Sequence, residues 1–182
     1  MNRLITYLDR LTQPLEKLHW LLPTLARLVF ATSLAGYFWA SAKTKLGDGI
    51  LGVFQPSLGA YVQIFPQQME AVTYDVSQLT FGHWIVVMAG TWAEFLLPAL
   101  IIAGFLTRLS ALGMIGFVIV QTLTDLFGHK VIEHPETIGA WFDRFPDGVI
   151  LDQRAFWMLL LATLAIKGAG PLSVDRMLKS AP

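Results

Sequence analysis

The stretch from Trp84 to Leu106, WIVVMAGTWAEFLLPALIIAGFL, contains one charged residue, Glu94, close to its centre. Its length matches the roughly 20 residues that an α-helix needs to cross a bilayer. A carboxylate at that depth costs on the order of 2.5–3.5 kcal/mol on insertion scales, so we expect Glu94 to face the interior of a bundle. Pro98 has no N–H and deprives the Glu94 carbonyl of its helical donor, which predicts a free backbone acceptor and a kink at the same position.

The composition of the whole chain is that of a membrane protein. Of 182 residues, 54% are hydrophobic and 14% are charged, whereas soluble domains average about 25% charged residues. The 13 basic and 13 acidic residues balance, so nothing indicates binding to nucleic acid. The chain has no cysteine, which excludes thiol relays, disulfides, iron–sulfur clusters and c-type haem attachment. Any redox role therefore requires a bound cofactor or a partner subunit.

Four apolar stretches predict an all-α membrane protein, a four-transmembrane-helix bundle formed by one membrane domain over residues 21–182. The expected spans cover about 21–42, 84–106, 109–127 and 149–167. The fourth is the weakest, because its charge-free core, 155–166, has only 12 residues. Thr107 and Arg108 separate spans two and three, which predicts a tight antiparallel hairpin. The apolar segment 46–83, with its glycines and prolines, predicts short helices in the outer loop.

Residues 1–20 have leucines at helical spacing, which predicts an amphipathic helix at the cytoplasmic membrane surface, interrupted before Pro14. A helix that packs on the ends of the bundle is the alternative. With four spans, both termini and the Arg108 turn share one side. That side carries seven basic residues, and the other carries five together with nine acidic ones. The charge bias predicts a multi-pass membrane protein with both termini in the cytoplasm.

Glu94 and Gln121 lie equally far from the hairpin turn, each roughly 18 Å along its helix, so we expect them to be hydrogen-bonded neighbours. Gln121, Asp125 and His129 are spaced by four and share one helix face. With Lys45 at the outer end of span one, they predict a polar track from Glu94 to the outer surface. The alternative for Asp125, His129 and Lys45 is a set of solvated helix ends, and for Glu94 a structural carboxyl.

Arg27 starts lower, about 9 Å along span one, but its long side chain is expected to extend toward Glu94. The alternative is that its guanidinium reaches the cytoplasmic interface. His129 and His134 are weak candidates for a metal site, and we expect none. No histidine lies in the middle of a span, which excludes bis-histidine haem.

Several motifs, in order, resemble those of the DoxX family. The first span, LARLVFATSLAGYFWASAKTKL, has the family's arginine (Arg27) followed by lysine and leucine (Lys45 and Leu46). Glu94 in TWAEFLLPALIIAGF matches the glutamate of the second helix. The turn with Gly104, Thr107 and Arg108 and the C-terminal GAGPLSVD, residues 168–175, complete the resemblance, which extends from about residue 25 to 175.

The resemblance implies a four-helix protein of the bacterial inner membrane, with relatives linked to quinone-dependent thiosulfate oxidation, terminal oxidases and oxidative-stress assemblies. We therefore expect an accessory or membrane-anchor subunit of a redox or oxidative-stress assembly, with the bilayer, redox subunits or a second copy as partners. The alternative is a quinone-reactive component, in which Glu94, Gln121 and Asp125 hold and protonate the quinone and Lys45 or His129 relays protons. The ligand-binding candidates also include Arg27. A small transporter with a broken helix at Glu94 and Pro98 is the third hypothesis.

Overall fold

The computed structural model describes residues 2–180, and these form a helical structure whose only β pairing is an isolated bridge between Leu46 and Pro56. The main helices are α1 (Asn2–Glu16), α2 (Leu22–Ser33), α3 (Ala35–Thr44), α6 (Phe81–Ala103), α7 (Thr107–Leu123), α9 (Arg154–Lys167) and α10 (Val174–Ser180). Three helices in the described part are long and apolar enough to cross a membrane: Phe81–Ala103, Thr107–Gly128 and Val149–Lys167. The predicted all-α membrane class is confirmed at this level.

Helices α6 and α7 form the predicted hairpin, although their connection lies earlier than expected, at residues 104–106. Gly104 ends α6 in the left-handed conformation with φ +68°, and its backbone N–H donates to the carbonyls of Leu100 and Ile101. Leu106 is also left-handed, with φ +48°. Two residues with positive φ thus reverse the chain within a three-residue connection.

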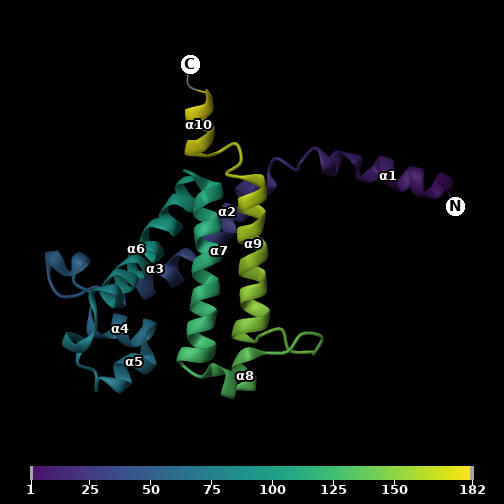
Figure 1. Ribbon diagram of the computed structural model, residues 1–182. Helices are drawn as coiled ribbons and strands as arrows, with labels where there is room; N and C mark the ends of the chain where they lie inside the picture. The colour runs from purple at the N-terminus through teal and green to yellow at the C-terminus, as the bar shows by residue number, and fades with distance from the viewer. Residues whose placement is uncertain (1, 181–182) are drawn as a thin grey trace.

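The weakest predicted span is a long helical segment in the structure. A π-helical turn, η5 (Val149–Gln153), continues directly into α9, and a similar turn, η3 (Thr124–Gly128), extends α7. The two helices lie side by side (Figure 1). Their contact surface contains fully buried Met114 and Val118 from α7 and Leu161 and Leu164 from α9. Apolar packing inside the bundle therefore compensates for the short charge-free core of this segment.

The first predicted span is not one continuous helix: it breaks at Leu34 into α2 and α3. Neither half reaches the length required to cross a bilayer on its own. The hydroxyls of Thr32 and Ser33 donate to the carbonyls of Leu28 and Val29 one turn earlier, and such back-bonding bends helices. The count of four spans therefore stays a prediction, whereas three spanning helices are described.

The two ends of the molecule are built differently (Figure 1). One end holds α1, α10 and the α6–α7 turn. The other end holds the short helices α4 (Leu58–Ile64), α5 (Pro66–Ala71) and α8 (Pro135–Ile138). With the 3₁₀ turns η1 (Ile50–Phe54) and η2 (Val76–Gln78), α4 and α5 confirm that the segment 46–83 contains short helices. The remaining 3₁₀ turn, η4 (Val131–Glu133), lies just before α8.

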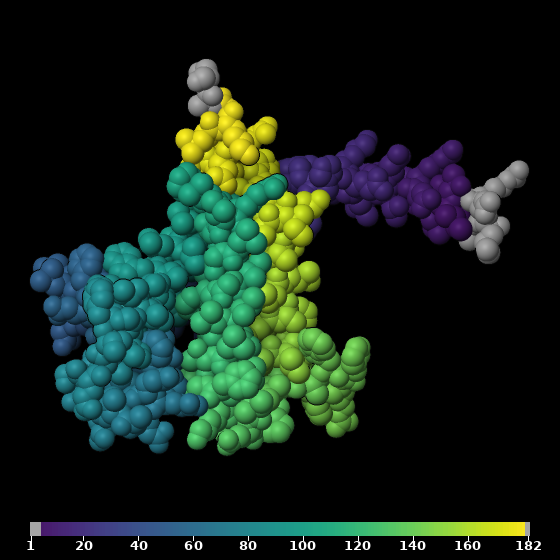
Figure 2. All heavy atoms as spheres, in the orientation of Figure 1, coloured from purple at the N-terminus to yellow at the C-terminus, as the bar shows by residue number. Residues whose placement is uncertain are grey.

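Helix α1 projects sideways from the body of the protein (Figures 1 and 2). Its apolar side chains are exposed, among them Leu8, Leu11 and Leu15. The predicted interruption before Pro14 is wrong, because α1 continues through Pro14 to Glu16. Pro14 lies near the end of the helix, so the single hydrogen bond that it removes does not terminate it. The location of α1 at a membrane surface stays a prediction.

Candidate functional site

A cavity of about 570 Å³ lies among α3, α4, α6 and α7. Small residues on the two long helices leave the space open, and at Gly116 an added Cβ would meet no atom within 4 Å. Apolar side chains such as Ile85, Phe117 and Val120 line much of the wall. The polar lining comprises Tyr37, Ser41, Lys45, Gln63, Glu94, Gln121, Thr124, Asp125 and His129. Five of the six residues proposed from the sequence as catalytic or ligand-binding candidates thus share one cavity.

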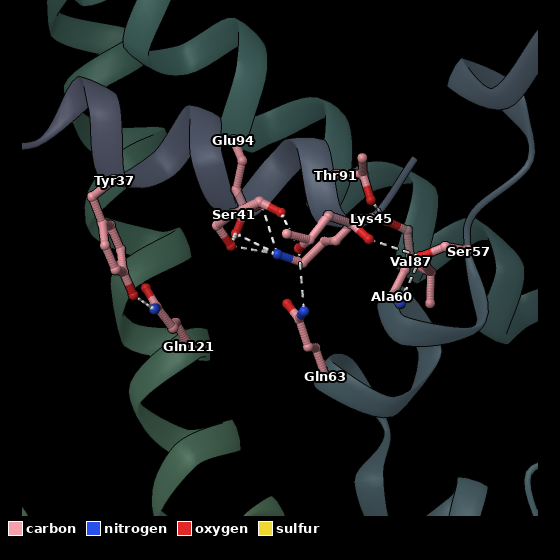
Figure 3. A network of polar contacts seen from close by, with 11 residues as sticks. Tyr37, Ser41, Lys45, Ser57, Ala60, Gln63, Val87, Thr91, Glu94 and Gln121 are labelled. Atoms are coloured by element: carbon pink, nitrogen blue, oxygen red, sulfur yellow. Dashed lines mark hydrogen bonds and ion pairs between the residues drawn. The ribbon is translucent and has the colours of Figure 1, made fainter. Parts of the chain in front are cut away.

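Lys45 and Glu94 form a buried ion pair at the wall of this cavity (Figure 3). The Lys45 Nζ lies 2.8 Å from Glu94 Oε2 and 3.0 Å from Oε1, and it also donates to Ser41 Oγ at 2.7 Å. Ser41 in turn donates to Glu94 Oε1 at 3.1 Å. Only 3% of Glu94 and 4% of Lys45 are exposed, so Glu94 faces the interior as predicted. The three N–H groups of the ammonium all have acceptors, which makes the cluster closed and electrically neutral.

Gln121 lies in the same cavity as Glu94, but the predicted hydrogen bond between them is not formed. Gln121 Nε2 instead donates to the hydroxyl of Tyr37 at 2.7 Å (Figure 3). Its Oε1 is buried and has no partner among the described residues. The side chain of Gln121 is thus directed toward α3 rather than toward Glu94 on α6.

Asp125 and His129 lie at the end of the cavity nearest the short helices. Asp125 pairs with the guanidinium of Arg154 at the start of α9, which also donates to Thr122. His129 Nε2 is 2.9 Å from the backbone carbonyl of Gln63 on α4. Because a carbonyl oxygen can only accept, the Nε2–H of His129 donates in this contact. The two residues thus connect α7 to neighbouring segments and still border the cavity.

Arg27 belongs to a different part of the protein. Its Nε donates to the carbonyl of Ile101 at 2.9 Å, and its two terminal nitrogens donate to the carbonyls of Ile102, Ala169 and Leu172. It therefore joins the C-terminal end of α6 to the segment that leads into α10. The expected reach toward Glu94 is not formed, because backbone carbonyls freed at the end of α6 accept from the guanidinium instead. A position of Arg27 at the cytoplasmic interface stays a prediction.

The structure gives no support to a metal site. The Nδ1 of exposed His134 lies 3.3 Å from Glu136 Oε1, whereas His129 contacts the carbonyl of Gln63. In the range 2–180 no group of three or more potential metal ligands comes together.

Pro98 lies inside α6 without ending it. The indole N–H of Trp39 donates to the carbonyl of Phe95 at 3.2 Å, one residue beyond the Glu94 carbonyl that proline deprives of its donor. A side chain from α3 therefore provides a hydrogen bond near the point where the backbone ladder of α6 is weakened. The same contact holds α3 against α6 beside the Lys45–Glu94 pair.

Sequence reasoning missed Tyr37, Ser41 and Gln63 as members of the site. Tyr37, Ser41 and Lys45 are spaced by four on α3 and so lie on one face of that helix, and this periodicity was the available signal. Gln63 lies in a segment whose packing no pattern revealed. Arg154 does not line the cavity, and its contact with the site is the ion pair with Asp125.

The sequence model of the DoxX family matches residues 22–130, which include the three helices that supply most of the cavity wall. No curated protein and no solved structure matches the chain.

Proposed function

The chain belongs to the DoxX family, and from this premise we propose that it is a membrane subunit of a redox assembly whose cavity binds the head group of a quinone. The observation that carries the proposal is the composition of the cavity: apolar walls surround a few hydrogen-bonding groups that are free to take a ligand. Its volume of about 570 Å³ lies in the range of roughly 300–1,000 Å³ that is usual for small-molecule sites.

The Tyr37–Gln121 pair fits the oxidised and the reduced head group. The Tyr37 oxygen accepts from Gln121, so its own O–H remains available to donate to a quinone carbonyl. Gln121 Oε1, buried without a partner, accepts from a hydroxyl of the reduced form. One donor and one acceptor lie side by side, and an unsatisfied buried acceptor costs about 1–3 kcal/mol until a ligand satisfies it.

The charged residues have separate roles in this proposal. The Lys45–Glu94 pair is neutral as a unit, so it presents a polar but uncharged wall to an uncharged ring. Asp125 and His129, at the end of the cavity near the short helices, are titratable groups that can pass protons between the cavity and water. A bound quinone would supply two-electron, two-proton chemistry, with electrons from a partner redox subunit. The proposal assigns electron transfer to a partner because the chain has no cysteine to form a redox-active thiol pair or to ligate an iron–sulfur cluster.

A cavity-filling variant tests the proposal without breaking a contact. Gly116→Leu places its side chain in the open space of the cavity, and Gly36→Leu places the same side chain in open space on the exposed face of α3. The proteins are purified in mild detergent and their extracted lipids are analysed for quinone. We expect near-stoichiometric quinone in the wild type and in Gly36→Leu, and loss of most of it in Gly116→Leu.

Tyr37→Phe removes the free donor and should weaken the binding of an added quinone about tenfold, the usual effect of one hydrogen bond. Absence of quinone from the wild type, or equal retention by both glycine variants, would overturn quinone binding. Co-purification of redox subunits without quinone would leave the chain an anchor subunit of the assembly.

A further inference from the structure

A second cavity, of about 590 Å³, lies at the end of the molecule that holds α10 and the α6–α7 turn. Its walls come from the start of α7, the end of α9 and the segment between α9 and α10. The quinone proposal does not involve this cavity, and none of its lining residues lines the first one.

Four cationic side chains line this cavity: Arg108, Lys167, Arg176 and Lys179. None of them forms a hydrogen bond or an ion pair with any residue between 2 and 180. They come from three helices, α7, α9 and α10, so the fold and not a single basic run brings them together. Four like charges around one cavity repel one another unless an anion binds there.

Asp175 is the one acidic residue in the cavity wall, and it is already engaged by the backbone. Its Oδ1 accepts from the N–H of Leu106 at 2.8 Å, and its Oδ2 accepts from the N–H of Thr107 at 3.0 Å. The carboxylate thus satisfies the first N–H groups of α7. Four positive charges less one negative charge leave a net charge of +3 on the cavity wall.

Apolar side chains adjoin these charges. Trp20, Leu106 and Leu109 line the same cavity and are 50%, 48% and 66% exposed. The cavity lies where α6 ends and α7 begins. Both helices are long and apolar enough to span a membrane. Cations with exposed apolar groups at the end of such helices match a lipid that carries its negative charge next to its acyl chains.

We propose that this second cavity binds a phosphate group, and that the phosphate belongs to the head group of an anionic phospholipid. Arg176 and Lys179 come from α10 and Arg108 and Lys167 from the bundle, so both parts of the protein would contribute charges to the site. Binding at this position would hold α10 against the ends of α7 and α9. A soluble phosphate compound has the same charge chemistry, and the experiment separates the two sources.

The test compares two variants of equal net charge. Arg176→Gln/Lys179→Gln removes two cations from the cavity, and Lys43→Gln/Lys130→Gln removes two exposed cations that do not line it. Native mass spectrometry measures binding of phosphatidylglycerol and phosphatidylcholine to the full chain, with inorganic phosphate in a separate titration. We expect the wild type and the second variant to prefer phosphatidylglycerol, and the first variant to bind it about 30-fold more weakly, at roughly five- to sixfold for each lost cation.

Saturable binding of inorganic phosphate with the same dependence on Arg176 and Lys179, without a lipid preference, would support the phosphate site and assign it to a soluble ligand. Equal binding of the two lipids together with no phosphate binding would overturn the proposal. Equal weakening in both variants would overturn it as well, because the effect would then follow net charge alone. Circular dichroism of each variant verifies that α10 and the bundle remain folded.

Discussion

Lys45 and Glu94 lie 49 residues apart in the chain, and the ammonium of Lys45 contacts both carboxylate oxygens of Glu94, at 2.8 and 3.0 Å. Ser41 completes the cluster, because its hydroxyl accepts from Lys45 and donates to Glu94. The pair joins the end of α3 to the middle of α6, and both of these helices border the first cavity. It is therefore a structural connection and a wall of the proposed quinone site at the same time.

Removing one partner of this pair should cost more than removing both. Glu94→Gln leaves a buried ammonium without a counter-charge, and we expect a loss of about 3–5 kcal/mol in the free energy of unfolding. Lys45→Met should cost a similar amount, because it leaves the buried carboxylate of Glu94 without a counter-charge. The double variant Lys45→Met/Glu94→Gln should lose clearly less free energy of unfolding than the sum of the two single losses. Unfolding in detergent, followed by circular dichroism, measures this double-mutant cycle, and simple additivity would contradict the closed pair.

Asp175 should contribute stability that depends on pH. Burial acts to raise the pKa of its carboxyl, but the backbone N–H groups of Thr107 and Leu106 outweigh that effect and hold the pKa below its usual value. The contribution is therefore complete above about pH 3.9, the usual value in an unfolded chain. It is lost as the pH falls further, through the lower pKa of the folded protein.

Asp175→Ala should lower the free energy of unfolding by about 1–3 kcal/mol at neutral pH, since two hydrogen bonds to a carboxylate disappear. The difference between the wild type and this variant should shrink as the pH falls through the acid range. Asp175→Asn is the control, because it keeps one acceptor and does not titrate. A difference that stays constant down to acid pH would show that the charge of Asp175 is not what stabilises the start of α7.

The sequence was enough to predict the membrane class, the α6–α7 hairpin and the inward position of Glu94. Each of these depends on a strong local signal: long apolar runs, a short connection, and the cost of a charge in hydrocarbon. Asp125 and His129 were predicted to share one helix face with Gln121, in a polar track that begins at Glu94, because residues spaced by four lie on one face of a helix. The structure places all four residues in one cavity.

The partners of those residues were harder to predict. The prediction that Gln121 is the partner of Glu94 compared the distances of the two residues from the hairpin turn and assumed that every span is straight and continuous. The break at Leu34 changes the course of α3 and brings Lys45 to Glu94 instead. Which way a side chain points around its helix, and where a bent helix ends, depend on tertiary packing that a single sequence does not encode locally.

The orientation predicted from charge can be tested cleanly, because the chain has no cysteine. Met177 on α10 and Phe142, which follows α8 in the chain, are both exposed. Helices α10 and α8 lie at opposite ends of the molecule (Figure 1). In spheroplasts, a membrane-impermeant maleimide should label Phe142→Cys and should label Met177→Cys only after the membrane is opened. The reverse pattern would place both termini outside, and equal labelling of the two thiols would contradict a fixed orientation.

Gly104 should tolerate no side chain, in contrast to Gly36. Gly104 has φ +68°, and an added Cβ would lie 2.6 Å from Ser173 Cβ and 2.7 Å from Arg27 Cζ. Both neighbours are held in place, Arg27 by four backbone carbonyls and Ser173 by the carbonyl of Gly170. Gly104→Ala should therefore combine the cost of a left-handed residue, about 1 kcal/mol or more, with a clash that pushes α10 away from the bundle.

Gly36→Ala provides the matched comparison, because its Cβ would meet nothing within 4 Å on a helix. It should raise the free energy of unfolding by about 0.5–1 kcal/mol, since alanine loses less backbone entropy than glycine in a helix. Unfolding of the two variants in detergent measures the contrast, and hydrogen exchange in residues 169–175 reports the loss of the Arg27 contacts in Gly104→Ala. Equal stability of the two variants, with exchange unchanged, would show that the α6–α7 turn is not locked by Arg27 and Ser173.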